Sequence, residues 1–389
     1  MSSDLYTVTK HTTAAAFPRA RGGTLLTNDR LEIAYLRFSP KSGKSKDPSV
    51  INIDLVFSHG TGMNKSIWKY HIDQLYKYAA KVGPSENWKL NRVISIDAVS
   101  HGDSALINHG KLGWSYRWED GAKDVIAVIK AEQLKTGDFV NDANNKTIMV
   151  GHSLGASQSL LLSAYEPFLL DTAFAIEPVA FIEESDSEKF TNIIRKMGTM
   201  IKDEFESEGA LEKYMTKYGF LRNFDPRVLK DVIEDEKYDA TGSDGIVKFK
   251  TKSSTAQQLA TYMTGFYSIP LAMSILPTIR SNVVHVAGKK ATWNPPKAVP
   301  FIRNTIPKEF VTGIDIEDGE HLVNGERPDE IISEISKCIS DRVKLAHKNR
   351  DNYPEIKYHG QRDEILTHQW QKMLDGKIED AIDFTLSKF

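Results

Sequence analysis

The chain has 389 residues, with 50 basic and 52 acidic side chains and a formal net charge of −2. This balance excludes a strong overall field that would draw the chain to nucleic acid or to an anionic membrane surface. A hydrophobic content of 40% excludes a largely disordered chain. The single cysteine, Cys338, cannot form an internal disulfide, which favours a reducing compartment.

No apolar run reaches the roughly 20 residues that cross a bilayer, so we expect no transmembrane segment. The nearest candidate, Gly265–Ile279, contains two prolines and is too short. The start of the chain lacks the pattern of a signal peptide. We therefore expect a soluble, intracellular protein.

Short apolar runs separated by amphipathic stretches predict a parallel sheet with helices on both faces, which is the α/β class. The predicted strands are Leu31–Arg37, Ile53–Ser58, Val93–Asp97, Thr147–Val150, Phe174–Glu177, Val283–Ala287 and Phe310–Ile314. The predicted helices outside the interrupted region are Leu154–Tyr165 and Pro328–Ala346 in the core and Asp363–Phe384 near the C-terminus.

The strand pattern is interrupted between about Val179 and Ser281, where apolar residues recur at helical spacing. Within this region Asp225-Pro226 predicts a helix start, with an N-cap followed by proline at the first helical position. The predicted organisation is a flexible N-terminus (1–22), an α/β core (23–178 and 281–350), a helical cap (179–280) and a helical tail (351–389).

Gly151-His152-Ser153-Leu154-Gly155 follows one predicted strand and precedes a helix. In this context the pattern predicts a strained turn that projects a nucleophilic serine, Ser153, from the sheet edge. The alternative is a small-residue turn without chemistry. Leu154 and Thr61, the latter in the glycine-bearing turn His59–Gly62, are the expected backbone N–H donors for an oxyanion. We interpret His59 as a brace for its loop.

Ser153 needs a base, and His321 lies late in the chain, between a predicted strand and a helix, where the order Ser, acid, His places it. We interpret His152 as a space-filling residue that faces away from the nucleophile. The orienting acid is harder to assign, because Ala291 stands where a carboxylate would be expected after the strand Val283–Ala287. Glu177, at the end of the preceding strand, is therefore the expected acid.

Three other acids compete with Glu177 for this role, and Glu177 itself could be a surface or hinge residue. Asp315 and Asp318 lie too close to His321 in sequence to face it easily. Asp97 is a weaker alternative, because it is better explained as a residue that ties its turn together. The expected catalytic set is Ser153, His321 and Glu177.

Methionine and aromatic side chains of the cap could line a substrate pocket for a flexible chain, although most of them are expected to pack the cap helices together. A tryptophan beyond the core strand Val283–Ala287 is an equal candidate for pocket wall or packing. The candidates are Trp293, Phe266, Tyr267 and Met197.

Several motifs together resemble those of fungal α/β-hydrolases of the peroxisomal lipase type, with relatives in fungal toxin biosynthesis. The motifs are His59–Met63, Asp97–Ser104, Gly151–Gly155, Ile176-Glu177-Pro178, Trp293-Asn294-Pro295-Pro296 and Gly319–Asn324. The resemblance covers most of residues 20–340. It implies an α/β-hydrolase fold, a serine nucleophile acting on esters or acylglycerols, and a peroxisomal location.

The sequence ends in Ser387-Lys388-Phe389, which resembles the peroxisomal signal Ser-Lys-Leu except for its last residue. We expect these residues to contact a peroxisomal import receptor and the protein to reside in the peroxisomal matrix. The alternative location of the protein is the cytoplasm. In that case the segment is an ordinary helical tail that happens to end in Phe389.

The leading hypothesis is a serine carboxylic-ester hydrolase (lipase or esterase) that acts on a small acyl ester or lipid through an acyl-enzyme. An acyl-CoA thioesterase or an acyltransferase could use the same nucleophile, and a non-catalytic ligand-binding protein is a minority alternative. A thioesterase would need basic groups for the CoA phosphates, for which Lys65, Lys69, Lys289 and Lys290 are candidates. No motif calls for a metal or an organic cofactor.

Overall fold

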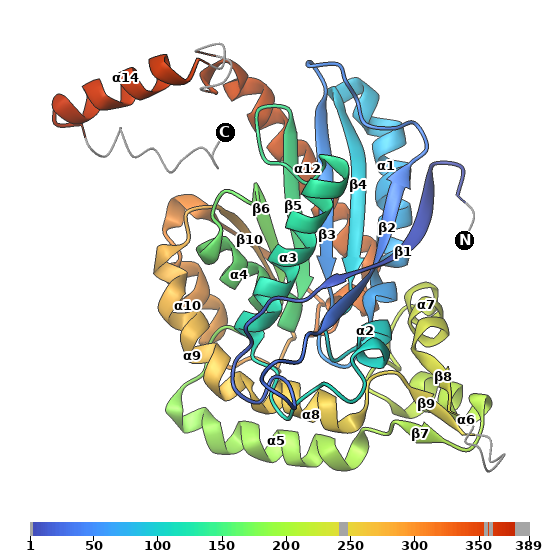
Figure 1. Cartoon of the computed structure of the whole chain (residues 1–389). Coiled ribbons are helices and arrows are strands. Elements are labelled where there is room, and N and C mark those ends of the chain that lie inside the picture. The colour runs from blue at the N-terminus through green and yellow to red at the C-terminus, as the bar shows by residue number, and fades with distance from the viewer. Residues whose placement is uncertain (1–2, 241–247, 354–356, 358–360, 378–389) are drawn as a thin grey trace.

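The structure is a computed structural model that describes residues 3–240, 248–353, 357 and 361–377. An eight-stranded sheet forms its centre, in the order β1-β2-β4-β3-β5-β6-β10-β11 (Figure 1). β1 and β2 are antiparallel to their neighbours, and the strands from β4 to β11 run parallel. The strands are β1 (Tyr6–Ala14), β2 (Glu32–Pro40), β3 (Ile51–Ser58), β4 (Trp88–Ile96), β5 (Asn145–His152), β6 (Thr172–Ile176), β10 (Asn282–Gly288) and β11 (Val311–Ile316).

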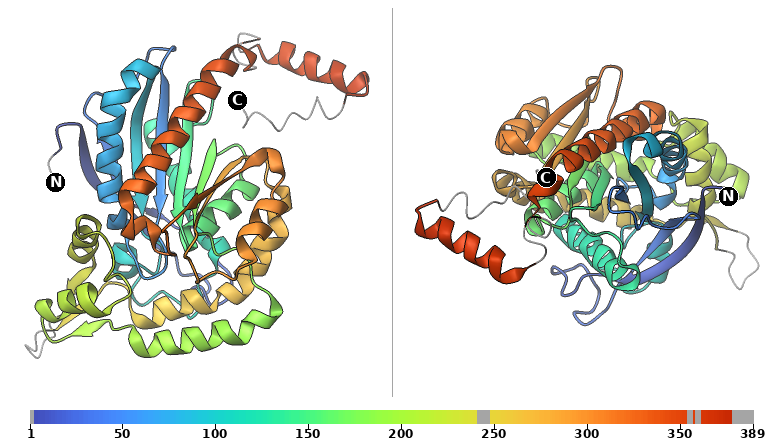
Figure 2. Two further views of the ribbon diagram at one scale, coloured as in Figure 1. Left: turned by 180° about the vertical axis from the view of Figure 1, so that it is seen from behind. Right: turned by 90° about the horizontal axis from the view of Figure 1, so that it is seen from above.

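Helices cover both faces of this sheet, as the near-continuous burial of β3 and β5 requires. The helices α3 and α4 lie on one face, and α1 and α12 lie together on the opposite face (Figures 1 and 2). The core helices are α1 (Lys69–Glu86), α2 (Gly102–Ile107), α3 (Trp118–Thr136), α4 (Leu154–Tyr165), α10 (Ala298–Thr305), α11 (Val323–Glu326) and α12 (Pro328–Asn349).

The cap lies at the carboxyl ends of the parallel strands, where α5 and α8 run side by side (Figure 1). Its helices are α5 (Ser187–Met200), α6 (Glu208–Lys213), α7 (Pro226–Glu236), α8 (Thr255–Met263) and α9 (Gly265–Ile275). The predicted start of α7 is confirmed, because the Asp225 side chain accepts a hydrogen bond from the Arg227 N–H and Pro226 occupies the first turn. Short helical turns also occur at η1 (Lys65–Trp68), η2 (Glu184–Asp186), η3 (Tyr214–Tyr218), η4 (Leu276–Thr278), η5 (Lys308–Phe310) and η6 (Arg350–Asn352).

One prediction about the organisation was wrong, and a second was incomplete. Residues 1–22 are not a flexible terminus throughout, because β1 pairs with β2 along its length and the buried Tyr6 ring stacks on Tyr76 at 4.7 Å. The cap is not purely helical, because it contains a small antiparallel sheet in the order β7-β9-β8. Its strands are β7 (Glu204–Phe205), β8 (Lys237–Asp239) and β9 (Phe249–Thr251).

The helix predicted over Asp363–Phe384 is α14 (Arg362–Leu374), which extends away from the rest of the molecule (Figure 1). Gly376 follows with a left-handed φ of +75°, a conformation that ends a helix. Residues 378–389, including Ser387-Lys388-Phe389, lie outside the described residues.

Within the described part of the chain, no single helix has the length and apolar composition needed to cross a membrane. The helices Thr255–Met263 and Gly265–Thr278 meet these criteria only as a pair, and they are bent by 41° at the break between them.

A buried cluster of charged groups joins the core to the cap. The Lys65 ammonium lies 2.8 Å from Asp97, 2.9 Å from Asp103 and 2.8 Å from Asp235 of α7. Lys252, from the cap, pairs with Asp103 and Asp235. Lys65 is therefore a buried structural cation. The sequence had suggested Lys65 as a phosphate contact, and the structure contradicts this role.

Glu236 is buried beside this cluster, where its carboxylate accepts hydrogen bonds from the Asn64 amide and the Ser253 N–H. Burial, opposed by these hydrogen bonds and by Lys252 and reinforced by Asp97, raises the pKa of Glu236 from 4.5 to about 7. The free energy of unfolding therefore falls as the pH rises from 4.5 to 7, because over this range the group ionises in the unfolded chain but stays protonated in the folded one.

Glu236→Gln removes the titrating carboxyl but keeps only one of its two acceptor oxygens. We therefore expect the effect of this variant on the free energy of unfolding to be more favourable at pH 8 than at pH 4.5, by up to about 3 kcal/mol. The advantage should shrink as the pH falls through 7 and disappear near 4.5. Urea unfolding at both pH values measures it, with Glu234→Gln, an exposed change on the same helix, as the control. An equal effect at both pH values would contradict the assignment.

Candidate active site

Ser153 stands at the turn between β5 and α4, with a φ of +51° and a ψ of −110°. A non-glycine residue holds this conformation only where its surroundings enforce it. The turn is compact on both sides, because a Cβ at Gly151 would lie 2.3 Å from the Gly155 carbonyl oxygen and a Cβ at Gly155 would lie 2.4 Å from that of Ser58. The two glycines thus let the turn form and present the serine hydroxyl at the sheet edge.

The hydroxyl of Ser153 and two other predicted side chains form one line of hydrogen-bonding distances. Ser153 Oγ lies 3.1 Å from Nε2 of His321, and Nδ1 of His321 lies 3.1 Å from Oε2 of Glu177. β5 and β6 are neighbouring strands, so Ser153 and Glu177 emerge at adjacent positions of the sheet. His321 reaches them from the loop between β11 and α11.

Glu177 is buried, with 3% of its surface exposed, and its carboxylate is fully supported by donors. Oε1 accepts a hydrogen bond of 2.7 Å from the Gly288 N–H, and Oε2 accepts one of 3.2 Å from the Asn294 amide. The main chain at Glu177 has a φ of +50°, and its N–H donates to the Val286 carbonyl at 2.8 Å. The loop after β10, which lacks an acid at Ala291, therefore holds the acid supplied by β6.

The other acids considered for this role have different partners. Asp315 lies 2.6 Å from the Arg303 guanidinium and Asp318 lies 2.6 Å from Lys290. Asp97 is committed to Lys65 and to the N–H groups of residues 65 and 103, which matches its expected role in the turn.

The sequence had suggested that His152 fills space and faces away from the nucleophile. In the structure it lies beside His321 and lines the cavity that contains Ser153. Its ring lies against His321, with centroids 5.2 Å apart, and its Nε2–H donates to the His321 carbonyl at 2.8 Å. Burial lowers the pKa of His152 to about 3, so the ring stays neutral. This hydrogen bond fixes the main chain of His321. In the sequence, only the position of His152 next to Ser153 could have indicated this role.

Two further neutral imidazoles hold the turn that contains Thr61. His59 Nε2 accepts from the Ala98 N–H at 3.1 Å, and His101 Nε2 accepts from the Gly62 N–H at 3.0 Å. Burial lowers the pKa of both rings, so each can remain an acceptor. His59 therefore contacts the main chain as expected for a residue that braces its loop, and His101 has the same role.

Ser153 and His321 open into a cavity of about 400 Å³ under the cap. Thr61, Met197 and Trp293 line it, as do Phe220 and Tyr262, two of the aromatic side chains of the cap. Leu154 occupies the first turn of α4, where an N–H has no partner within the helix. Burial raises the pKa of the Tyr262 hydroxyl.

The candidates Phe266 and Tyr267 do not line this cavity. Phe266 packs edge-on against Phe190 at 5.1 Å, and Tyr267 is 65% exposed and lies beside Arg117. Both belong to α9, whose opposite side packs on the core. Helical spacing alone could not indicate which side faces the nucleophile.

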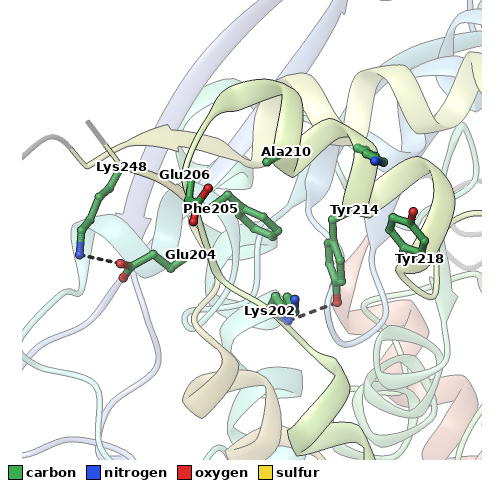
Figure 3. A pocket seen from close by; sticks show the side chains of 9 residues that line it. Lys202, Glu204, Phe205, Glu206, Ala210, Tyr214, Tyr218 and Lys248 are labelled. Carbon is green, nitrogen blue, oxygen red and sulfur yellow. Dashed lines mark hydrogen bonds and ion pairs between the residues drawn. The ribbon is translucent and has the colours of Figure 1, made fainter. Parts of the chain in front are cut away.

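A larger hollow, of about 730 Å³, lies on the outer part of the cap and contains none of Ser153, Glu177 and His321. Figure 3 shows its lysine, glutamate and tyrosine side chains, with Lys248 paired to Glu204 and the Lys202 N–H donating to the Tyr214 hydroxyl. Its described lining residues include no nucleophile with an adjacent base, so we place the candidate site at Ser153.

The model of the alpha/beta hydrolase family matches residues 55–334, which include all three residues of this hydrogen-bonded line. The chain belongs to the alpha/beta hydrolase family. This confirms the predicted fold class and the family that the sequence motifs resemble.

This alpha/beta hydrolase is 30% identical over 359 residues to the peroxisomal membrane protein LPX1 of Saccharomyces cerevisiae, covering 89% of this chain and 90% of LPX1. The crystal structure of peroxisomal Lpx1 from the same organism superposes with a TM-score of 0.77 at 29% identity, over 88% of this chain and 90% of the other. The type I acyl-CoA thioesterase mpaH' of Penicillium brevicompactum is 24% identical over 181 residues, 46% of this chain and 38% of the thioesterase.

Proposed function

We propose that this hydrolase cleaves carboxylic esters through an acyl-enzyme on Ser153. The observation that carries the proposal is the continuous contact from Ser153 Oγ through the His321 ring to the buried Glu177 carboxylate. Such a line lets the imidazole take the serine proton while the carboxylate fixes its tautomer and stabilises the resulting cation.

In the proposed reaction, Ser153 Oγ bonds to the acyl carbon as His321 Nε2 accepts the hydroxyl proton. The N–H groups of Leu154 and Thr61 stabilise the tetrahedral oxyanion, and collapse of this intermediate expels the alcohol, which takes the proton from His321. Water then attacks the acyl-enzyme with His321 as base, releasing the carboxylic acid and restoring Ser153. The strained turn at Ser153 supports this role, because it presents the hydroxyl without rearrangement.

The test is hydrolysis of p-nitrophenyl esters from acetyl to palmitoyl by the wild type and by Ser153→Ala. We expect turnover in the wild type and a loss of at least 10³-fold in the variant, and a fluorophosphonate should label Ser153 in the wild type. Ser163→Ala, a change at a buried serine of α4 whose hydroxyl donates to the Ser159 carbonyl, is the matched control. Equal rates in wild type and Ser153→Ala would refute the proposal.

A thioester substrate is the second candidate, supported by the partial match to acyl-CoA thioesterases. The same nucleophile would attack a thioester carbonyl and expel a thiol. Comparing kcat/KM for octanoyl-CoA and p-nitrophenyl octanoate decides between the two, and a preference of tenfold or more for the CoA ester would favour the thioesterase.

We also propose a peroxisomal location, supported by the name of the relative LPX1. Fluorescence microscopy of the full chain with an N-terminal fluorescent tag, with and without Ser387-Lys388-Phe389, tests the location and the expected role of an import receptor. A diffuse signal from the complete chain would contradict this proposal.

A further inference from the structure

A second cavity adjoins the one that contains Ser153. It has a volume of about 580 Å³, against about 400 Å³ for the catalytic cavity, and Ile193, Thr292 and Trp293 line both. The two spaces are therefore separated by side chains that belong to each of them. Residues of α5 in the cap, of α10 in the core and of the loop that follows β10 line the second cavity.

The indole of Trp293 is the largest of these shared side chains, and its contacts fix its position. Its ring stacks on that of His321, with centroids 5.5 Å apart and an interplanar angle of 25°. Tyr262 lies 5.8 Å away on the catalytic side and Phe190 lies 6.3 Å away as a lining residue of the second cavity. Trp293 therefore stands at the boundary between the catalytic cavity and the second cavity.

Apolar side chains form much of the wall of the second cavity, namely Val179, Phe181, Ile182, Phe190, Ile269 and Val299, and the charged side chains of Asp186 and Lys189 also line it. Several polar groups that reach it are engaged elsewhere. Glu177 is bound by Gly288, Asn294 and His321, Lys289 pairs with Glu317, and Asp315 pairs with Arg303. An apolar space of this size is the environment that a hydrocarbon chain requires.

We propose that the second cavity binds a long unbranched hydrocarbon chain of the substrate, which reaches it from Ser153 past Trp293. The inference rests on the proposed ester hydrolysis and adds its substrate class, long-chain esters. Each methylene buried there should strengthen binding by about fourfold, the factor that corresponds to burial of one CH₂. The chain can belong to the acyl group or to the alcohol, because both are attached near the reacting carbon.

The test fills the cavity at a distance from the catalytic groups. Val299→Trp on α10 and Ile182→Trp in the segment between β6 and η2 each introduce a large ring at a lining position, and Asn304→Trp, at an exposed position of α10, is the matched control. The acyl arm compares p-nitrophenyl palmitate with p-nitrophenyl acetate, and the alcohol arm compares hexadecyl acetate with ethyl acetate.

We expect the ratio of long-chain to short-chain kcat/KM to fall at least tenfold in one arm for both filling variants, and to stay unchanged for Asn304→Trp. The arm that responds identifies the source of the chain. Ratios within twofold of the wild type in both arms would overturn the proposal.

Binding of palmitate and of hexadecanol to Ser153→Ala, measured by calorimetry, separates this proposal from the proposed function. If the wild type hydrolyses none of these esters, the proposed function fails, but a tenfold weaker binding after Val299→Trp in this background would still support the hydrocarbon site. Binding that is absent, or unchanged by both filling variants, would overturn it.

Discussion

We expect Glu177→Gln to lower kcat for ester hydrolysis by about 10³–10⁴-fold, with a much smaller change in KM. A glutamine can still accept from the Gly288 N–H with its oxygen. Its amide would then face His321 Nδ1, which could no longer donate to this position. The imidazole would favour the tautomer that carries its proton on Nε2, and this tautomer cannot accept the proton of Ser153.

The matched control is Glu317→Gln, which removes an exposed acid from the end of β11 that pairs with Lys289. We expect kcat within twofold of the wild type for this variant. Pre-steady-state kinetics with p-nitrophenyl butyrate measure the acylation rate directly, and circular dichroism checks that both variants are folded. If Glu177→Gln retained more than a tenth of the wild-type kcat, Glu177 would not be the acid that orients His321.

The second large effect is expected on stability. Lys65→Met should lower the free energy of unfolding by about 3–5 kcal/mol, because it leaves buried carboxylates without their central cation. Asp97 is fully buried and Asp235 is 8% exposed, so water cannot replace the lost ammonium group. Lys252 would still pair with Asp103 and Asp235, whereas Asp97 would lose the ammonium group of Lys65 with which it pairs.

Urea unfolding at pH 7 measures this change, and two variants control for it. Lys10→Met removes an ammonium that lies 3.5 Å from the same Asp103 but is 74% exposed, so its effect should stay below about 1 kcal/mol. Lys65→Met combined with Asp97→Asn should recover part of the lost stability, since it removes a charge that has lost its partner. A loss below 1 kcal/mol for Lys65→Met would show that the cluster does not join cap and core energetically.

The acid site shows how two loops share one function in this chain. The position after β10 at which a carboxylate was expected is Ala291, and the same loop supplies the Gly288 N–H and the Asn294 amide that hold Glu177. A carboxylate that emerges from β6 reaches His321 because β6 and β10 are adjacent, and the loop after β10 completes its environment. The motif Trp293-Asn294 thus contributes a wall of the cavity and a donor to the acid.

The local patterns of the sequence were sufficient for most of the core. Strand and helix positions follow from hydrophobic periodicity, and the turn around Ser153 follows from its glycines, because these depend on residues close together in the chain. The choice of Glu177 also came from the sequence, by elimination at Ala291 and by the cost of burying an acid at a strand end. β1 was missed because its mixed polar pattern forms a strand only where β2 offers an edge.

Only the tertiary structure decided which distant groups meet. His152 contacts His321 across 169 positions, Lys65 meets Asp235 across 170, and Trp293 divides two cavities whose walls come from cap and core. Likewise, α9 packs on the core through the face that carries Ile269 and Ala272, and Phe266 and Tyr267 are not among the residues that line the catalytic cavity. Periodicity states that a helix has an apolar face, whereas the packing of the other elements determines what that face contacts.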